Sequence, residues 1–164
     1  MITNSPNEKI SLKAREISEA IFVSEEDPNQ MPITKETKKR LQEINKDSIL
    51  YKIDEKENLI AWVVTIPTST ELMDKFLSKE INEKELFEQT KPNTEYDALY
   101  LCAIVTVPEY RNKGYAKEMT LEAINRFEKT KDLKIFAWPT SKEGLGLLTT
   151  LEKETGRKIY LRID

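Results

Sequence analysis

The sequence contains no histidine and a single cysteine, Cys102, among its 164 residues. Without histidine the chain cannot build a Ser-His-Asp or Cys-His relay, and it has no imidazole to hold a metal or shuttle protons. One cysteine excludes an internal disulfide and a thiolate zinc cluster. We therefore expect no metal, and any catalysis would depend on carboxylates, hydroxyls, the thiol, backbone amides or a cofactor.

Long apolar runs and a strong charge of one sign are missing as well. No stretch approaches the roughly 18 uninterrupted apolar residues of a membrane span. The opening segment, MITNSPNEKISLK, lacks the apolar core of a signal peptide. The 26 basic and 29 acidic residues give a net charge of −3, which offers no general reason to expect a nucleic-acid partner. We expect a soluble cytoplasmic protein with neither a membrane nor a nucleic acid as partner; homodimer formation stays open.

The length suits one domain over residues 1–164, and the hydrophobic periodicity predicts alternating helices and strands. The first half is predicted to hold a helix with Ile10, Ala14, Ile17 and Ile21 on one face, a loop over 25–32, a charged helix over 34–44, and a hairpin of strands 48–53 and 58–66 that Pro67 ends. The second half is predicted to hold a strand over 98–107, a helix over 114–129, a strand over 133–138, a helix from Ser141 to about Glu154 stopped by Gly156, and a strand over 158–163.

Between the hairpin and the long strand lies an acidic segment, residues 68–90, that is predicted to be helical in two pieces. T-S-T-E at 68–71 and N-E-K-E at 82–85 each resemble a capping pattern at a helix start. From 67 to 97 there are eight acidic and four basic residues. Such a charge run is usually a solvated face, and the segment would either attract a cationic amine or only cover a sheet edge.

The strand over 98–107 is predicted to have two different faces. Period two places Leu99, Leu101, Ala103, Val105 and Val107 on one wholly aliphatic face. The other face is mixed and includes Tyr100 and Cys102, the two reactive side chains of the strand.

After this strand comes V-P-E-Y-R-N-K-G-Y-A, residues 107–116, in which Arg111, Gly114 and Ala116 form R-x-x-G-x-A at a strand-to-helix turn. A turn of this kind presents unpaired backbone N–H groups and the positive end of a helix dipole, which suit a pyrophosphate. Residues 111–134 carry seven basic and four acidic side chains, which adds local positive charge. An ordinary strand-to-helix connection with a turn glycine would explain the spacing equally well.

The stretch 99–124, LYLCAIVTVPEYRNKGYAKEMTLEAI, resembles the signature strand, P-E-Y-R turn and helix of the GNAT family of acyl-CoA-dependent N-acyltransferases. The resemblance implies an α/β fold with a mixed, mostly antiparallel central sheet, one parallel strand pair splayed around the CoA site, and helices on both faces. It also implies acetyl-CoA, or another short acyl-CoA, as co-substrate, and a small-molecule or peptide amine as acceptor.

The resemblance assigns two groups of cofactor-binding residues. The backbone amides of the turn would hold the CoA pyrophosphate; these belong to Arg111, Asn112, Lys113, Gly114, Tyr115 and Ala116. The main chain of Ile104, Val105 and Thr106 would pair with the pantetheine arm and the acyl carbonyl, and this pairing would stabilise the oxyanion. The strand over 133–138 would splay away to admit the cofactor, with Trp138 near the cleft.

The catalytic positions depart from the family pattern. Glu152 stands where the family often has a tyrosine that protonates the leaving thiolate, and Leu145 replaces a frequent asparagine. The family's general-base positions fall on Tyr100 and Cys102, and Tyr100 would more readily donate a proton than accept one. Tyr100, Cys102 and Glu152 are thus the candidate catalytic residues, and Glu152 would need a raised pKa to serve as an acid.

Two departures concern the fold: a helix opens the chain where a strand is expected, and one terminal strand stands where two are expected. The leading hypothesis is an N-acyltransferase in which the amine attacks the thioester directly. The alternatives are a catalytically silent CoA-binding module and an interaction protein that uses the acidic segment.

Overall fold

From the first helix onward, the order of helices and strands in a computed structural model of the chain matches the prediction; the structure describes residues 1–23, 30–31, 34–92, 95–128 and 133–163. The strands are β1 (Ile2–Thr3), β2 (Ile49–Ile53), β3 (Leu59–Thr68), β4 (Ala98–Thr106), β5 (Lys134–Ala137) and β6 (Ile159–Leu161). The helices are α1 (Glu8–Val23), α2 (Lys35–Ile44), α3 (Thr70–Leu77), α4 (Glu83–Gln89), α5 (Tyr115–Phe127) and α6 (Lys142–Thr155), with a 3₁₀ turn, η1, at Pro108–Tyr110.

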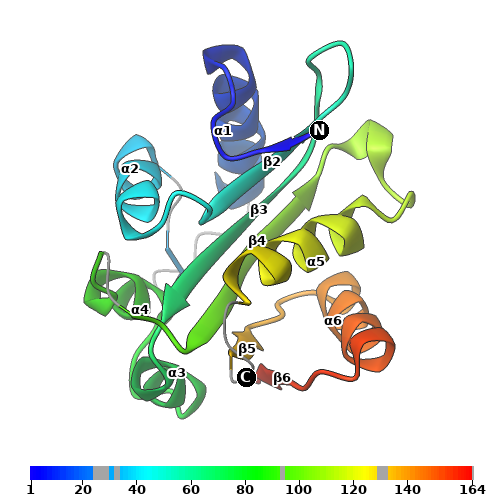
Figure 1. Cartoon of the computed structure of the whole chain (residues 1–164). Coiled ribbons are helices and arrows are strands. Elements are labelled where there is room, and N and C mark those ends of the chain that lie inside the picture. Colours follow the sequence, from blue (N-terminus) through cyan, green and yellow to red (C-terminus); the bar gives the residue numbers. More distant parts are fainter. Residues whose placement is uncertain (24–29, 32–33, 93–94, 129–132, 164) are drawn as a thin grey trace.

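The strands form one mixed sheet in the order β1-β2-β3-β4-β5-β6 (Figure 1). Neighbours from β1 to β4 are antiparallel, and the β4–β5 and β5–β6 pairs are parallel. The parallel pairs arise because α5 and α6 each carry the chain back to the edge from which the next strand starts. The predicted α/β architecture is thereby confirmed.

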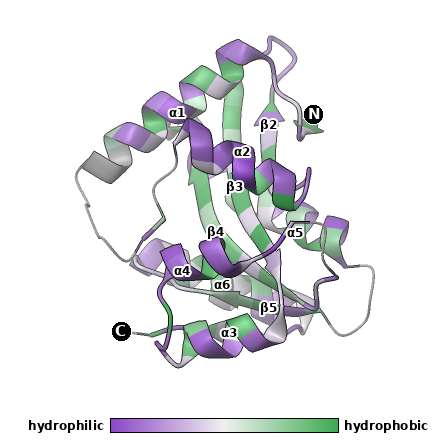
Figure 2. Ribbon diagram, turned by 90° about the vertical axis from the view of Figure 1, so that its left-hand side faces the viewer, coloured by the Kyte–Doolittle hydropathy of each residue, from purple (hydrophilic) through white to green (hydrophobic). Residues whose placement is uncertain are grey.

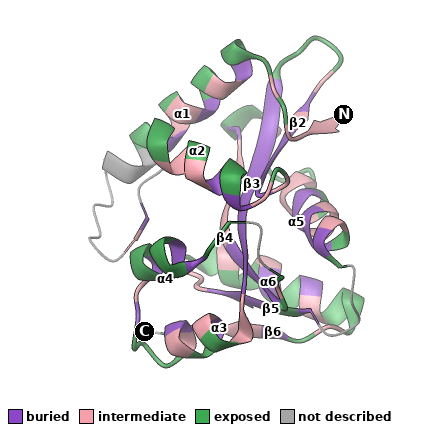
Figure 3. Ribbon diagram, turned by 60° about the vertical axis from the view of Figure 1, so that its left-hand side comes forward, coloured by how far each residue is buried: buried purple, intermediate pink, exposed green. Residues whose placement is uncertain are grey.

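Helices cover both faces of the sheet. On one face, α1 to α4 pack on a core that includes Trp62, Ile66 and Tyr100. On the other face, α5 and α6 pack on Leu99, Leu101 and their neighbours. The central strand β3 is buried along its whole length, as Figure 3 shows, whereas α2 is largely hydrophilic in Figure 2 and buries only Leu41 and Ile44.

A bulge in β4 overturns the predicted faces of that strand. Thr65 pairs with Leu101 and Val64 with Ala103, so Cys102 is an extra residue opposite β3. Beyond a bulge the alternation of side chains is reversed. Ala103, Val105 and Val107 therefore pack with Tyr100 on the α1–α4 face instead of sharing the face of Leu99 and Leu101. The prediction of one aliphatic face from 99 to 107 was wrong for this reason.

Two smaller predictions also need correction. The chain opens with strand β1, which pairs with β2 through Ile2 and Thr3, before the first helix begins. Pro67 does not end β3, because the strand continues to Thr68. The Thr65 N–H donates to the carbonyl of Ser48, on the β2 side of the strand. The nitrogen of Pro67, two residues later, faces the same side. Because β2 does not extend that far, the missing N–H of proline costs no hydrogen bond between strands.

The acidic segment forms two short helices, as predicted. Asn82 caps α4 with a reciprocal bond pair to Glu85, as the N-E-K-E pattern indicates, whereas α3 is capped by Ser69 one residue later than expected. Ser141 and Gly156 delimit α6 as predicted. The predicted loop over 25–32 lies mostly outside the described residues, as do the side chain of Ile21 and the predicted helix end at Lys129.

Candidate active site

The parallel strands β4 and β5 separate halfway along β4. They are paired from Ala98–Lys134 to Leu101–Ala137, where β5 ends while β4 continues to Thr106. Residues 98–101 are buried and residues 102–106 only half-buried. One edge of the second half of β4 thus has no strand beside it, and a strand edge without a neighbour presents N–H and C=O groups that can pair with a ligand.

The direction of these backbone groups follows from one hydrogen bond. The Val107 N–H donates to the carbonyl of Ile60 on β3 at 2.9 Å. Because backbone groups alternate along a strand, Val105 also faces β3, and the groups of Ile104 and Thr106 face the open edge. An acyl-pantetheine chain is predicted to pair with Ile104, Val105 and Thr106, but Val105 pairs with Trp62 instead. The backbone groups of Ile104 and the N–H of Thr106 face the open edge, where the Thr106 carbonyl accepts from Nε of Arg111 at 3.4 Å.

The open edge leads directly to the N-terminus of α5. The 3₁₀ turn η1 follows β4, and both Asn112 and Gly114 have positive φ, 64° and 81°. Gly114 is the N-cap and provides no side-chain cap for the helix. The first bond of the helix is from Glu118 N–H to the Gly114 carbonyl, so the amides of residues 115–117 precede the helical ladder and point out of its end.

Gly114 is required by backbone conformation rather than by space. A Cβ built on Gly114 meets no atom within 4 Å, but its φ of 81° lies in the left-handed region that side chains disfavour. The turn therefore needs glycine for its left-handed conformation, which sets the direction of these amides. Space alone would allow a small side chain at this position.

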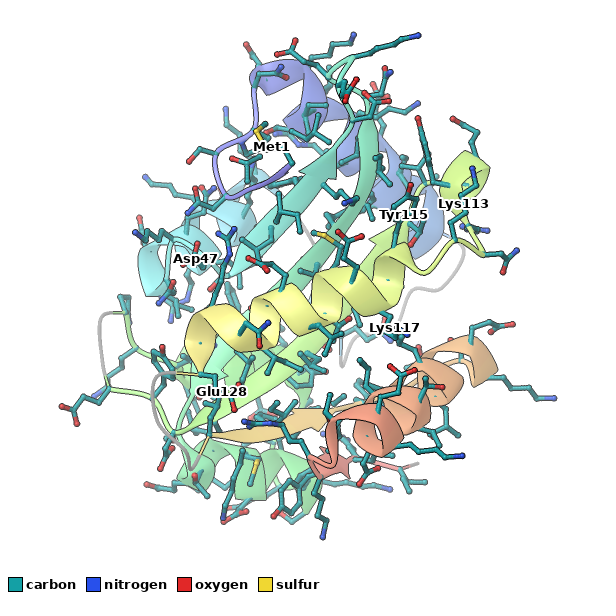
Figure 4. The ribbon with its side chains drawn as sticks, turned by 45° about the vertical axis from the view of Figure 1, so that its right-hand side comes forward. Met1, Asp47, Lys113, Tyr115, Lys117 and Glu128 are labelled. Atoms are coloured by element: carbon teal, nitrogen blue, oxygen red, sulfur yellow. The ribbon has the colours of Figure 1, made fainter. Side chains whose placement is uncertain are left out.

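Less positive charge gathers at this turn than the sequence count of 111–134 suggests. Figure 4 shows Lys113 and Tyr115 at the N-terminal end of α5 and Lys117 in the first turn of the helix. Lys117 bonds to Glu154 of α6 at 3.1 Å, and Lys113 lies over the Tyr110 ring. Arg126 pairs with Asp47 near the opposite end of α5. Arg111 and Lys113, both exposed, are the cations best placed for an anion at the turn.

Tyr100 and Cys102 lie together on the α1–α4 face, beside a carboxylate that the sequence analysis did not single out. Tyr100 is fully buried, and its hydroxyl donates to Oε2 of Glu83 at 2.6 Å. Oε1 of Glu83 accepts the backbone N–H of Met31 at 2.8 Å. Glu83 is the first residue of α4 and is 6% exposed. A buried acidic group is therefore hydrogen-bonded to a β4 residue that lies one position before the last β4–β5 pair.

Burial sets the ionisation of the two β4 side chains. Burial, and next the charge of Glu83, raise the pKa of Tyr100 well above its usual value of 10. The same two causes raise the pKa of the Cys102 thiol well above 9. At neutral pH the phenol and the thiol are both protonated, which makes Tyr100 a hydrogen-bond donor and leaves Cys102 without the thiolate that a nucleophile needs.

Arg162, just after β6, holds the acidic segment against the sheet. Its Nη1 donates to the carbonyls of Phe76 and Ile81, which lie at the end of α3 and before α4. Its guanidinium lies 4.6 Å from the centroid of the Phe76 ring and 4.9 Å from that of the Trp138 ring. Trp138, half-buried directly after β5, thus belongs to the wall that carries Glu83.

Metal-binding clusters and membrane-spanning helices were both sought among the described residues. There, no three acidic or cysteine side chains converge in a way that would hold a metal ion. No helix in the same part of the chain combines the length and apolarity needed to cross a bilayer.

Comparison with solved structures finds proteins of the same architecture. NAA60 of Arabidopsis thaliana, determined in complex with acetyl-CoA, aligns with a TM-score of 0.59 and 13% identity over 93% of this chain and 84% of its own. The chain has the GNAT fold. Another solved acetyltransferase aligns with a TM-score of 0.50 and 16% identity over 94% of this chain and 87% of its own. No protein-family model and no curated protein matches the sequence.

Within the GNAT fold, the third candidate, Glu152, lies apart from the other two. It is half-buried on α6, which packs on the face of the sheet opposite to Tyr100 through Leu148 and Leu151. Leu145, one of the few large exposed apolar side chains, lies on the same helix. The structure therefore brings Tyr100 and Cys102 together with Glu83 and places Glu152 in the other helical layer.

Proposed function

We propose that the protein transfers an acetyl group from acetyl-CoA to an amine. The observation that carries this proposal is the continuous run from the open edge of β4 into the uncapped N-terminus of α5. An extended acyl-pantetheine chain can pair with the edge while a pyrophosphate sits at the helix end. The GNAT fold, shared with a protein solved in complex with acetyl-CoA, supports this ligand.

The turn would bind the pyrophosphate through backbone amides from Arg111 to Ala116. The partial positive charge of the α5 N-terminus favours an anion there, and Arg111 and Lys113 add side-chain charge at the rim. Left-handed residues such as Asn112 and Gly114 occur in the backbone turns that gather successive amides around an anion, which supports this placement of the pyrophosphate.

The thioester would lie along β4, with its carbonyl oxygen accepting a backbone N–H of the open edge. Ile104 and Thr106 provide the N–H groups that point there. When the amine attacks, the C–N bond forms and the carbonyl oxygen gains negative charge, which this preplaced N–H stabilises. Collapse then breaks the C–S bond and releases CoA, whose sulfur takes a proton.

Direct attack by the amine fits the side chains at the site better than a covalent enzyme intermediate. The raised pKa of Cys102 keeps its thiol protonated. The thioester is already activated, so placing the amine against it supplies much of the rate enhancement.

Acetyl-CoA binding and turnover test the proposal together. We expect acetyl-CoA at 100 times its Kd to stabilise the protein by about 2.7 kcal/mol in a thermal-shift titration. Thiol release from acetyl-CoA, measured with spermidine, a lysine-containing peptide and a peptide with a free N-terminus, should exceed the rate without an amine. Binding without thiol release would favour a silent CoA-binding module, and no shift at millimolar acetyl-CoA would contradict both readings.

A further inference from the structure

The only buried carboxylate among the described residues belongs to the acidic segment rather than to the sheet. Glu83 is 6% exposed, whereas its neighbours Lys84 and Glu85 on α4 are exposed. Ionised carboxylates are rarely buried unless donors surround them. Tyr100 and the Met31 amide provide such donors, one to each oxygen.

The position of Glu83 relates it to the open edge of β4. Tyr100, its hydrogen-bond partner, pairs with Phe136, one residue before β4 and β5 part. Cys102, the first residue of the open edge, is close enough to Glu83 to feel its charge. Ile104 follows two residues later, about 7 Å along the strand. Glu83 is thus tied through Tyr100 and Cys102 to the part of β4 where the open edge begins.

Glu83 lies on the face of the sheet opposite to the one on which α5, with its predicted pyrophosphate site, packs. Helices α5 and α6 cover the opposite face and form the end where the pyrophosphate would bind. The α1–α4 face carries Tyr100, Cys102 and Trp138 around the point of separation. An acceptor that approaches from this face comes from the side of the sheet on which Glu83 lies.

We infer that Glu83 binds the acceptor ammonium and takes its proton, with Tyr100 as a positioning residue that holds the carboxylate. This inference rests on the proposed acetyl transfer and adds the role of the segment between β3 and β4. An ammonium gives one proton to the Glu83 carboxylate and becomes a neutral amine, which attacks the thioester. The second nitrogen proton leaves with the CoA thiol, so the products are an amide, CoA and one proton held by Glu83 until solvent takes it.

Other groups around Glu83 fit this role. Tyr100 and Cys102 face it from β4, and Arg162, in the segment after β6, lies near enough to Tyr100 for its charge to act on that hydroxyl. The phenol and the thiol are neutral at pH 7, so the carboxylate is not opposed by another anion from β4. Arg162 binds the carbonyls of Phe76 and Ile81 and stacks on Trp138, which fixes the start of α4.

The experiment is the pH profile of kcat/KM for the fastest amine of the panel, with wild type, Glu83→Gln, Tyr100→Phe and a control. We expect Glu83→Gln to lower kcat/KM at least 100-fold at pH 7.5. The fall of kcat/KM at low pH, the acidic limb of the profile, should also disappear, because the glutamine side chain does not titrate. Tyr100→Phe should move that limb to higher pH, because removing a hydrogen bond to the carboxylate raises its pKa. Glu88→Gln, the same change at an exposed position of α4, should keep activity within twofold.

Folding and acetyl-CoA binding are measured on each variant, and binding should change less than twofold. If Glu83→Gln does not fold, the shift of the limb in Tyr100→Phe decides the question. If the wild type is active but the acidic limb persists in Glu83→Gln, or does not move in Tyr100→Phe, then the role of Glu83 is overturned and the proposed acetyl transfer still stands. A wild type that binds no acetyl-CoA or releases no thiol overturns the proposed function, and the role of Glu83 with it.

Discussion

The hydroxyl of Tyr100 donates to Oε2 of Glu83 at 2.6 Å and so joins the middle of the sheet to the first residue of α4. These residues are 17 positions apart in the chain, and both are buried. The contact explains why a segment rich in solvated charge nevertheless has a fixed position over β4.

Tyr100→Phe should lower the free energy of unfolding by about 1–3 kcal/mol, because it removes a hydrogen bond to a buried carboxylate. Urea unfolding at pH 7 measures this effect. Tyr51→Phe is the matched control, because Tyr51 is also buried on the same face and within the described chain its hydroxyl makes no hydrogen bond. The fall in unfolding free energy for Tyr51→Phe should be less than half of that for Tyr100→Phe. Equal losses would show that the Glu83 bond contributes little stability.

The stability of the protein should fall at alkaline pH. Burial raises the pKa of Tyr51 to about 12, so the folded state holds a proton that the unfolded state has lost above pH 10. Between pH 10 and 12 this residue should remove about 1 kcal/mol of stability per pH unit. Tyr100 and Cys102 titrate similarly in wild type and in Tyr51→Phe, so the difference between the two proteins isolates Tyr51. Parallel pH curves for the two would contradict the prediction.

Gly114→Ala should weaken acetyl-CoA binding by at least tenfold, because the left-handed φ of 81° strains any side chain and turns the amides of the pyrophosphate site. Calorimetric titration measures the affinity. Gly156→Ala is the control, because Gly156 also has positive φ, 67°, with no atom within 4 Å of a built Cβ, but it caps the far end of α6. Both variants should lose about 1–2 kcal/mol of stability, and only Gly114→Ala should lose affinity.

Arg162→Lys should loosen the connection between α3 and α4. Lysine keeps the charge but loses the planar stacking on Phe76 and Trp138, together with the paired bonds to two carbonyls. We expect a loss of about 2 kcal/mol and faster hydrogen exchange over residues 76–83. Arg126→Lys is the control, because it alters a more exposed ion pair with Asp47. It should lower the unfolding free energy by less than about 1 kcal/mol and leave hydrogen exchange over residues 76–83 unchanged.

The sequence predicted most of the fold because its local signals agreed with one another. The β2–β3 hairpin, the Asn82 and Ser141 caps and the Gly156 stop all follow from short-range chemistry that tertiary contacts did not override. The bulge at Cys102 could not be predicted in this way. It depends on how β4 registers against β3, and apolar residues stand at consecutive positions along β4, so the sequence pattern does not reveal where the faces are reversed.

The candidate site was predicted less completely than the fold. The turn at 111–116 was found from its spacing, but Glu83 was counted among the solvated charges of its segment. A signal was present: Glu83 precedes Leu86 and Phe87 by three and four residues, which places it on the buried face of α4. Its partner Tyr100 could not be named from the sequence, because the packing of α4 against β4 is a long-range contact.

The two outermost strands, β1 and β6, are only two and three residues long. A short outer strand offers few unpaired amides to a neighbouring molecule, which protects a sheet from edge-to-edge aggregation. The unpaired run of β4 lies instead on an inner strand of the sheet, at half-buried residues. The backbone groups that this sheet leaves for a ligand are therefore set back from its two outer edges, where a strand of another molecule would add.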